Sequence, residues 1–336
     1  MTVPSSITDS EPGTRVSRRQ REAAVWRMLL LRLASALFVL WGTVTVTFLV
    51  LAILPGDRAT ILLNITSGQA IERTLEELAP INERYGFDRP IVSQYVHYVS
   101  GLLHGDLGTS YELQRPVINV ISEQIAPTFT LAFSALVLAW LFTVPWTLLT
   151  AGNGRRVGAF GAAAETIMAG LPQYWIGILL LIVFAIQLGW FPVIGGTGFA
   201  DTVLPTVTLA IPLAGFIGQS IRSEFDRTMQ EPFVLSARAR GMSSGGVRAR
   251  HVLRHALIPA ITLSGWAIGH LLSGTVLVET VFARPGLGSV LVNAVSNKDF
   301  ALVSGIVILN AFFYVVINLI VDLIYPIVDP RLRGTI

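Results

Sequence analysis

The sequence predicts an all-α integral membrane protein with six transmembrane helices, and its composition and apolar runs are the basis for this. The chain of 336 residues is 52% hydrophobic and only 13% charged, whereas about a quarter of a soluble domain is charged. Apolar runs of about 20 residues recur, and each is long enough to cross a bilayer core as a helix. Runs this long and continuously apolar are not strands of a membrane barrel, so helices must satisfy the backbone groups in lipid.

The expected spans follow one another along most of the chain. They cover about 29–54, 127–150, 165–188, 203–221, 257–281 and 302–325. The first run is too long for the core of a signal peptide, so we expect it to be retained. Residues 1–27 before it are polar and poor in aromatic side chains, which predicts a disordered extension ahead of a membrane domain over 28–333. In the third span, Pro172 predicts a kink that makes room for a substrate.

The positions of the basic residues predict the orientation. Most of the 24 Lys and Arg residues flank the same ends of the spans: before residue 33, at 155–156, in the loop 222–256 and near the C-terminus. Because cytoplasmic loops carry the excess of Lys and Arg, both termini and the loop 222–256 are predicted to be cytoplasmic.

The longest external segment is then 56–124, which carries more acidic than basic residues. Within it Ile91, Tyr95, Tyr98 and Leu102 recur at helical spacing, which predicts an amphipathic helix at the outer membrane interface. Either this segment is a contact surface for another protein, or it only caps the helix bundle.

The stretch "FVLSARARGMSSGGVRARHVLRHALIP" (233–259) has five arginines and no carboxylate. Two short helical segments flank Gly241, and small residues on the first allow another protein to approach closely. Arginine can bind carboxylates on such a partner through two parallel hydrogen bonds. The stretch therefore reads as a docking loop, and the alternative is that its arginines serve only to keep it inside the cell. The candidate docking residues are Phe233, Ala237, Arg238, Ala239, Arg240 and Gly241.

This loop resembles the cytoplasmic EAA loop of permease subunits of binding-protein-dependent ABC importers, nearest to the B-type subunit of the dipeptide/oligopeptide/nickel permease family. The motif's glutamate falls on Leu235 and its first alanine on Ser236, and His255 stands where asparagine is common. Further matches in family order are "LPGD" (54–57), "RYGFDRPIVSQY" (84–95), "GDLGTS" (105–110), "LPQYWIGILLL" (171–181), "VLVETVFARPGLG" (276–288) and "NLIVDLIYPIVDPRLR" (318–333).

The resemblance implies a type I ABC importer fold in the bacterial plasma membrane. It implies a pore subunit that translocates short peptides, with nickel, nickel chelates or glutathione-like solutes as family alternatives. The implied partners are a second homologous permease subunit, two ATPase subunits or domains that bind ATP and Mg, and an extracytoplasmic substrate-binding protein. Membrane lipid surrounds such a subunit, and nucleic acid is not an expected partner.

The residues themselves predict no catalytic or metal site and no cofactor in this chain. There is no GxxxxGK[ST] sequence, and the only lysine is Lys298. The chain therefore does not bind ATP through a phosphate-binding loop of this kind. His251 and His255 share a helix face but lack the glutamate of a zinc-protease motif. The absence of cysteine excludes disulfides and thiolate sites. No cluster in the spans suits a bare metal ion, which favours peptides as substrate.

Ionisable residues inside spans are costly and usually have a function. We therefore predict that His270 and Glu279 line the translocation pathway together with Pro172 and Trp175. The alternatives are a helix-packing hydrogen bond for His270 and an interfacial ion pair with Arg284 for Glu279. Glu165 is expected at the membrane interface.

Two other classes of protein remain as alternatives. A secondary carrier would need coupling-ion sites at the midplane, usually within an inverted repeat. The sequence shows no internal repeat and only one central ionisable residue. A membrane-embedded hydrolase would need acids and histidines that cluster in the sequence, and they do not.

Overall fold

The computed structural model describes residues 18–53, 57–69 and 71–328, and these ranges are helical apart from turns and one isolated bridge between Thr109 and Pro116. Five helices are long and apolar enough to cross a membrane, and a bent pair makes a sixth span if it is counted as one. The long helices are α1 (Arg18–Ile53), α5 (Val117–Thr150), α8 (Phe199–Thr228), α11 (Leu253–Val281) and α13 (Phe300–Val328). The predicted all-α membrane fold is therefore confirmed.

The helix bounds differ from the predicted spans at several places. Helix α1 begins at Arg18, so residues 18–27 are helical where we expected a disordered extension. Residues 1–17 of that extension lie outside the described residues. Helix α5 begins at Val117, well before the predicted start near residue 127, and carries Pro127 in its interior.

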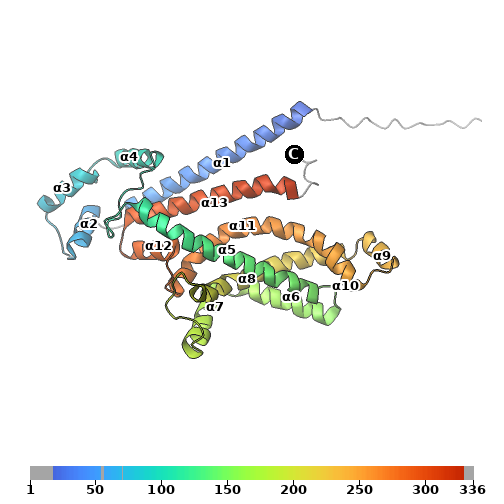
Figure 1. The fold of residues 1–336 in the computed structure, drawn as a ribbon. Helices are drawn as coiled ribbons and strands as arrows, with labels where there is room; N and C mark the ends of the chain where they lie inside the picture. The colour runs from blue at the N-terminus through green and yellow to red at the C-terminus, as the bar shows by residue number, and fades with distance from the viewer. Residues whose placement is uncertain (1–17, 54–56, 70, 329–336) are drawn as a thin grey trace, which may run out of the picture.

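Helix α8 lies at the centre of the bundle, where it packs against α5, α6 (Arg155–Gly170), α7 (Gln173–Leu180) and α11. Helices α1 and α13 lie side by side along one flank (Figure 1). Glycine permits the closest approaches, as is usual between membrane helices. A Cβ on Gly215 of α8 would lie 2.4 Å from the backbone nitrogen of Ala169 in α6, and one on Gly265 of α11 would lie 2.2 Å from Val321 in α13.

The predicted kink at Pro172 is confirmed, and it is sharp. Helix α6 and the following segment, α7 with the π-helix η1 (Leu181–Gln187), meet at an angle of 95°. Leu171 has ψ 129°, which fits the exclusion of helical geometry for the residue before a proline. The third predicted span, 165–188, therefore consists of two helical segments that meet at this turn, and the first of them begins earlier than predicted, at Arg155.

A buried ion pair joins three helices near one end of the bundle. Arg222 of α8 donates to both carboxylate oxygens of Glu165 in α6, at 2.7 Å and 2.6 Å, and to the hydroxyl of Thr150 at the end of α5, at 2.5 Å. The Glu165 side chain is fully buried in the bundle. The expectation that it lies at the level of the membrane interface concerns its depth in the bilayer and stays a prediction. Gly161 makes room for the cluster, since a Cβ there would lie 2.5 Å from an Arg222 nitrogen.

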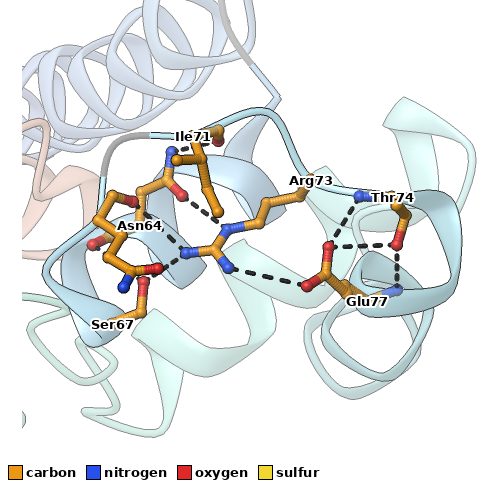
Figure 2. A network of polar contacts seen from close by, with 7 residues as sticks. Asn64, Ser67, Ile71, Arg73, Thr74 and Glu77 are labelled. Carbon is orange, nitrogen blue, oxygen red and sulfur yellow. Dashed lines mark hydrogen bonds and ion pairs between the residues drawn. The ribbon is translucent and has the colours of Figure 1, made fainter.

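At the opposite end, three short helices stand outside the bundle: α2 (Arg58–Ser67), α3 (Leu75–Tyr85) and α4 (Ile91–Leu103). Arg73 ties α2 to α3, donating to Asn64 at 2.8 Å and to Ser67 at 2.5 Å and lying 3.8 Å from Glu77 (Figure 2). The Glu77 carboxylate also accepts from the backbone and hydroxyl of Thr74, and these hydrogen bonds lower the pKa of Glu77.

The ion pair of Arg222 gives the first prediction. Arg222→Met leaves the Glu165 carboxylate buried without its partner, and we expect a loss of about 3–5 kcal/mol of stability. The double variant Arg222→Met/Glu165→Leu should recover most of that loss, because it removes both charges. Thermal unfolding of the purified protein in detergent measures both effects.

The matched control is Arg227→Met in the same helix, where Arg227 pairs with Glu224 and is itself 62% exposed. Exposed pairs contribute about 0–1 kcal/mol. If Arg222→Met changed the melting temperature as little as Arg227→Met does, the buried pair would not hold the bundle together.

Candidate functional site

The basic loop singled out in the sequence is a compact set of short helices between α8 and α11. It consists of α9 (Pro232–Ala239), α10 (Ser244–Val247) and the π-helix η2 (Arg248–Val252), which continues into α11. Pro232 is at the first helical position of α9, where its missing N–H costs nothing. Gly241 ends the turn after α9 with φ +84°, a conformation that favours glycine.

One face of α9 belongs to the core of this same chain. Val234 is 2% exposed and Ala237 is 1% exposed, and both join the cluster that contains Val247 and Val252. The carbonyl of Ala237 also accepts from Met242 N–H at 3.2 Å. The expectation that Ala237 is small because a partner's surface lies close is therefore wrong, since the neighbours of Ala237 come from its own chain.

The other face of α9 is open and combines apolar and basic side chains. Leu235 is 73% exposed and Phe233 is 37% exposed, with its ring 5.4 Å from that of His255. Arg238, Ala239 and Arg240 are exposed as well, and neither arginine forms an ion pair within the part of the chain that the structure describes. Leu235 was not among the predicted docking residues, although its apolar side chain in a basic stretch was a usable signal.

Glu279 has a different role from the predicted one. Its side chain is fully buried near the end of α11, where it accepts from Thr128 of α5 at 2.7 Å and from the backbone N–H of Gly288 at 2.7 Å and Ser289 at 3.2 Å. These N–H groups open α12 (Leu287–Ser296), so the carboxylate satisfies the free donors of a helix N-terminus. Glu279 therefore joins three helices and is not open to a pathway.

Arg284, the alternative partner of Glu279, donates instead to Thr202 of α8 at 2.6 Å. Its side chain is 2% exposed, and burial lowers the pKa of the guanidinium. Just beside it, Gly195 N–H donates to the carbonyl of Phe282 at 2.8 Å. These contacts fasten the first turn of α8 and the loop before it to the turn after α11.

His270 lies on an exposed face of α11. Its ring stacks on Trp266, with centroids 5.3 Å apart and planes 9° apart, and Trp266 in turn lies 5.3 Å from Phe216 of α8. Ser273, one turn further along α11, is exposed on the same side. The hydrogen bond to a neighbouring helix that we weighed as the alternative for His270 is not found among the described residues.

Pro172 and Trp175 lie on the exposed side of the sharp turn into α7, where Trp175 is 47% exposed. This turn packs next to α11: the Gln173 side-chain oxygen lies 2.8 Å from the position that a Cβ of Gly274 would take. Gln173 was not predicted, because only the folded chain shows that Gly274 lies opposite it. No group of three or more His, Asp or Glu side chains that could hold a metal ion occurs among the described residues.

Comparison with known proteins identifies the family. Residues 143–334 match the model described as binding-protein-dependent transport system inner membrane component, and residues 25–132 match the model of its N-terminal part. Together these matches extend from α1 to the C-terminal residues.

Curated relatives match over nearly the full length. A probable peptide ABC transporter permease protein of Sinorhizobium fredii is 33% identical over 314 residues, which cover 91% of this chain and 98% of the relative. The glutathione transport system permease protein of Salmonella typhimurium is 32% identical over 306 residues, again 91% of this chain and 98% of the relative.

A solved structure shares the fold. The inward-facing MetNI methionine ABC transporter matches with a TM-score of 0.51 at 15% identity, over 62% of this chain and 96% of the solved chain. The chain therefore belongs to the family of inner membrane components of binding-protein-dependent transport systems.

Proposed function

We propose that this chain is a pore-forming permease subunit of an ABC importer and that α9 is the element through which ATP hydrolysis acts on it. The observation that carries the proposal is the division of α9 into two faces. Val234 and Ala237 fasten the helix to the bundle, while Leu235, Phe233 and two unpaired arginines are exposed. An exposed leucine with basic neighbours suits a groove that is apolar at its base and acidic at its rim.

The partners follow from the family and from the two ends of the molecule. Two ATPase subunits or domains dock at the α9 end and bind ATP and Mg, so this chain is not itself an enzyme. An extracytoplasmic substrate-binding protein docks at the end formed by α2, α3 and α4. This arrangement makes the α9 end cytoplasmic, together with both termini, as the distribution of basic residues predicts.

A second, similar permease subunit completes the pathway, with the exposed face of α11 at the shared interface. His270 and Ser273 on that face are polar, whereas the exposed stripe of α5 consists of Phe133, Val137 and Leu141. Polar side chains at membrane depth face protein or water rather than lipid. His270 and the stacked Trp266 therefore line the pathway, and Pro172 and Trp175 border it. Glu279, which is buried, does not.

Short peptides are the proposed substrate. The relatives are named for peptide and glutathione transport, and both substrates consist of amide-linked amino acids. A bare nickel ion fits less well, because no cluster of metal ligands occurs among the described residues.

Leu235 tests the docking role of α9. Leu235→Asp removes an apolar contact worth roughly 2 kcal/mol and places a charge in the groove, so we expect the affinity for the ATPase to fall by roughly tenfold or more. Co-purification of the ATPase with a tagged permease measures this. The control is Leu75→Asp, because Leu75 is 85% exposed at the opposite end. Equal ATPase recovery with both variants would contradict the proposed docking surface.

Single cysteines test the orientation and the pathway, and the chain has no native cysteine to interfere. A membrane-impermeant maleimide should label Ser236→Cys on α9 only from the cytoplasmic side, and Glu76→Cys on α3 only from the outside. Ser273→Cys should be labelled within the span, because the thiolate that reacts forms only where water reaches it.

Leu141→Cys is the control for the span, since Leu141 is 68% exposed on the apolar stripe of α5. It should stay unlabelled in lipid. Labelling of Ser236→Cys from the outside would overturn the orientation, and equally slow labelling of Ser273→Cys and Leu141→Cys would remove the α11 face from the pathway.

A further inference from the structure

A cavity of about 470 Å³ lies at the end of the bundle that carries α2, α3 and α4. Its walls come from the last turns of α1, one face of α4, the loop 106–111 and the start of α13. The volume is in the range of small-ligand sites. No residue of this cavity belongs to α9 or to the exposed face of α11, so it is separate from the proposed ATPase-docking and pathway surfaces. It lies at the end of the molecule where the binding protein is proposed to dock.

The lining carries more positive than negative charge. Arg84 and Arg89 both line the cavity, and neither has a carboxylate partner within the described part of the chain. The guanidinium of Arg84 lies 5.6 Å from the centre of the Tyr85 ring. Asp106 is the one carboxylate of the lining, and it already accepts from Gly108 N–H at 2.8 Å. The guanidinium groups of Arg84 and Arg89, which have no carboxylate partner among the described residues, therefore favour an anionic ligand.

The last turn of α3 carries Arg84, and the turn that follows it carries Arg89. Gly86 ends α3 with φ +66°, and a Cβ on it would lie 3.2 Å from the side chain of Arg89. The Gln94 side chain of α4 donates to the carbonyls of Phe87 at 3.0 Å and Arg89 at 2.8 Å. These hydrogen bonds fix the backbone of the turn that carries Arg89 to α4.

The surroundings of the cavity are those of a membrane surface. On α4, Val92, Val96 and Leu103 form an exposed apolar stripe, with Leu103 82% exposed. Tyr95 and Tyr98 of the same helix pack on Phe48 of α1, at centroid distances of 5.3 Å and 5.7 Å. An amphipathic helix with tyrosines, set on the end of a span, lies at the level of lipid headgroups. The adjacent surface of α1 is apolar too, since Val50 and Ile53 are exposed.

We propose that this cavity binds the headgroup phosphate of an anionic membrane phospholipid, with Arg84 and Arg89 on the phosphate and the acyl chains along α1 and α4. Tyr85, Tyr98 and Tyr111 surround the headgroup. The guanidinium forks match phosphate oxygens in geometry as well as in charge. The bound lipid fastens α4 to the α1–α13 pair at the membrane surface. The site requires only that the chain lies in a membrane, so it does not depend on the substrate or on the docking role of α9.

Native mass spectrometry of the detergent-purified transporter complex tests this site by titration with phosphatidylglycerol and with phosphatidylcholine of the same acyl chains. Wild type should prefer phosphatidylglycerol. Arg84→Gln and Arg89→Gln should each weaken its binding by about fivefold, the effect of one basic residue near a lipid surface. Arg84→Lys should keep most of the affinity, because it retains the charge.

Arg115→Gln is the matched control, since Arg115 is in the same segment, 48% exposed and paired with Glu123. It should bind phosphatidylglycerol as wild type does. Both cavity arginines are exposed, so unchanged melting temperatures will confirm that the variants are folded. Equal binding by the cavity variants and by Arg115→Gln would overturn the site. So would displacement of the lipid by soluble glycerol 3-phosphate or a dipeptide at comparable concentration, because the cavity would then hold a soluble anion.

Discussion

The buried pair of Arg222 and Glu165 is the interaction on which the arrangement of the bundle depends. Two charges in a protein interior are tolerated only when each satisfies the other, and here the guanidinium also reaches Thr150, so α5, α6 and α8 must keep one relative position. Gly161 and Gly218 complete this arrangement, because side chains at either position would crowd the pair. Since α8 leads almost directly into α9, the pair also fixes where α9 begins. The buried side chains of α9 then hold it against the start of α11, and displacing α9 alone would expose them.

A second buried carboxylate plays the same part at the opposite end. Glu279 takes the free N–H groups of α12 and the hydroxyl of Thr128, so the end of α11, the start of α12 and α5 are joined in one network. A Cβ on Gly286 would lie 2.2 Å from this carboxylate, which explains why glycine precedes α12. Between the two networks, the exposed face of α11 carries His270. Of the three ionisable span residues Glu165, Glu279 and His270, the first two are thus structural anchors and the third lies on an exposed face.

Much of the architecture could be predicted from the sequence, because span length and the position of prolines are local properties. The apolar runs predicted the membrane helices, and Pro172 predicted the bend. What the sequence could not show were partners far apart along the chain. Nothing near Glu165 indicates that Arg222, on another helix, neutralises it. Ala237 and Ala239 look alike in sequence, but only the packing of α9 shows that the first faces its own core and the second faces outward. Glu279 was assigned to the pathway because an ionisable side chain inside a span is energetically costly and usually has a function. The N–H groups of α12 that stabilise its carboxylate come close to it only in the folded chain.

In the proposed function, this chain forms half of a pore that is driven by an ATPase on another polypeptide. The most direct measurement is uptake of a labelled dipeptide into proteoliposomes that contain this chain, with the second permease subunit, the ATPase and the binding protein each added or withheld. The account predicts uptake only when all components and ATP are present, and none when this chain is left out. Uptake by this chain alone, driven by an ion gradient and indifferent to ATP, would contradict it and would identify a secondary carrier instead.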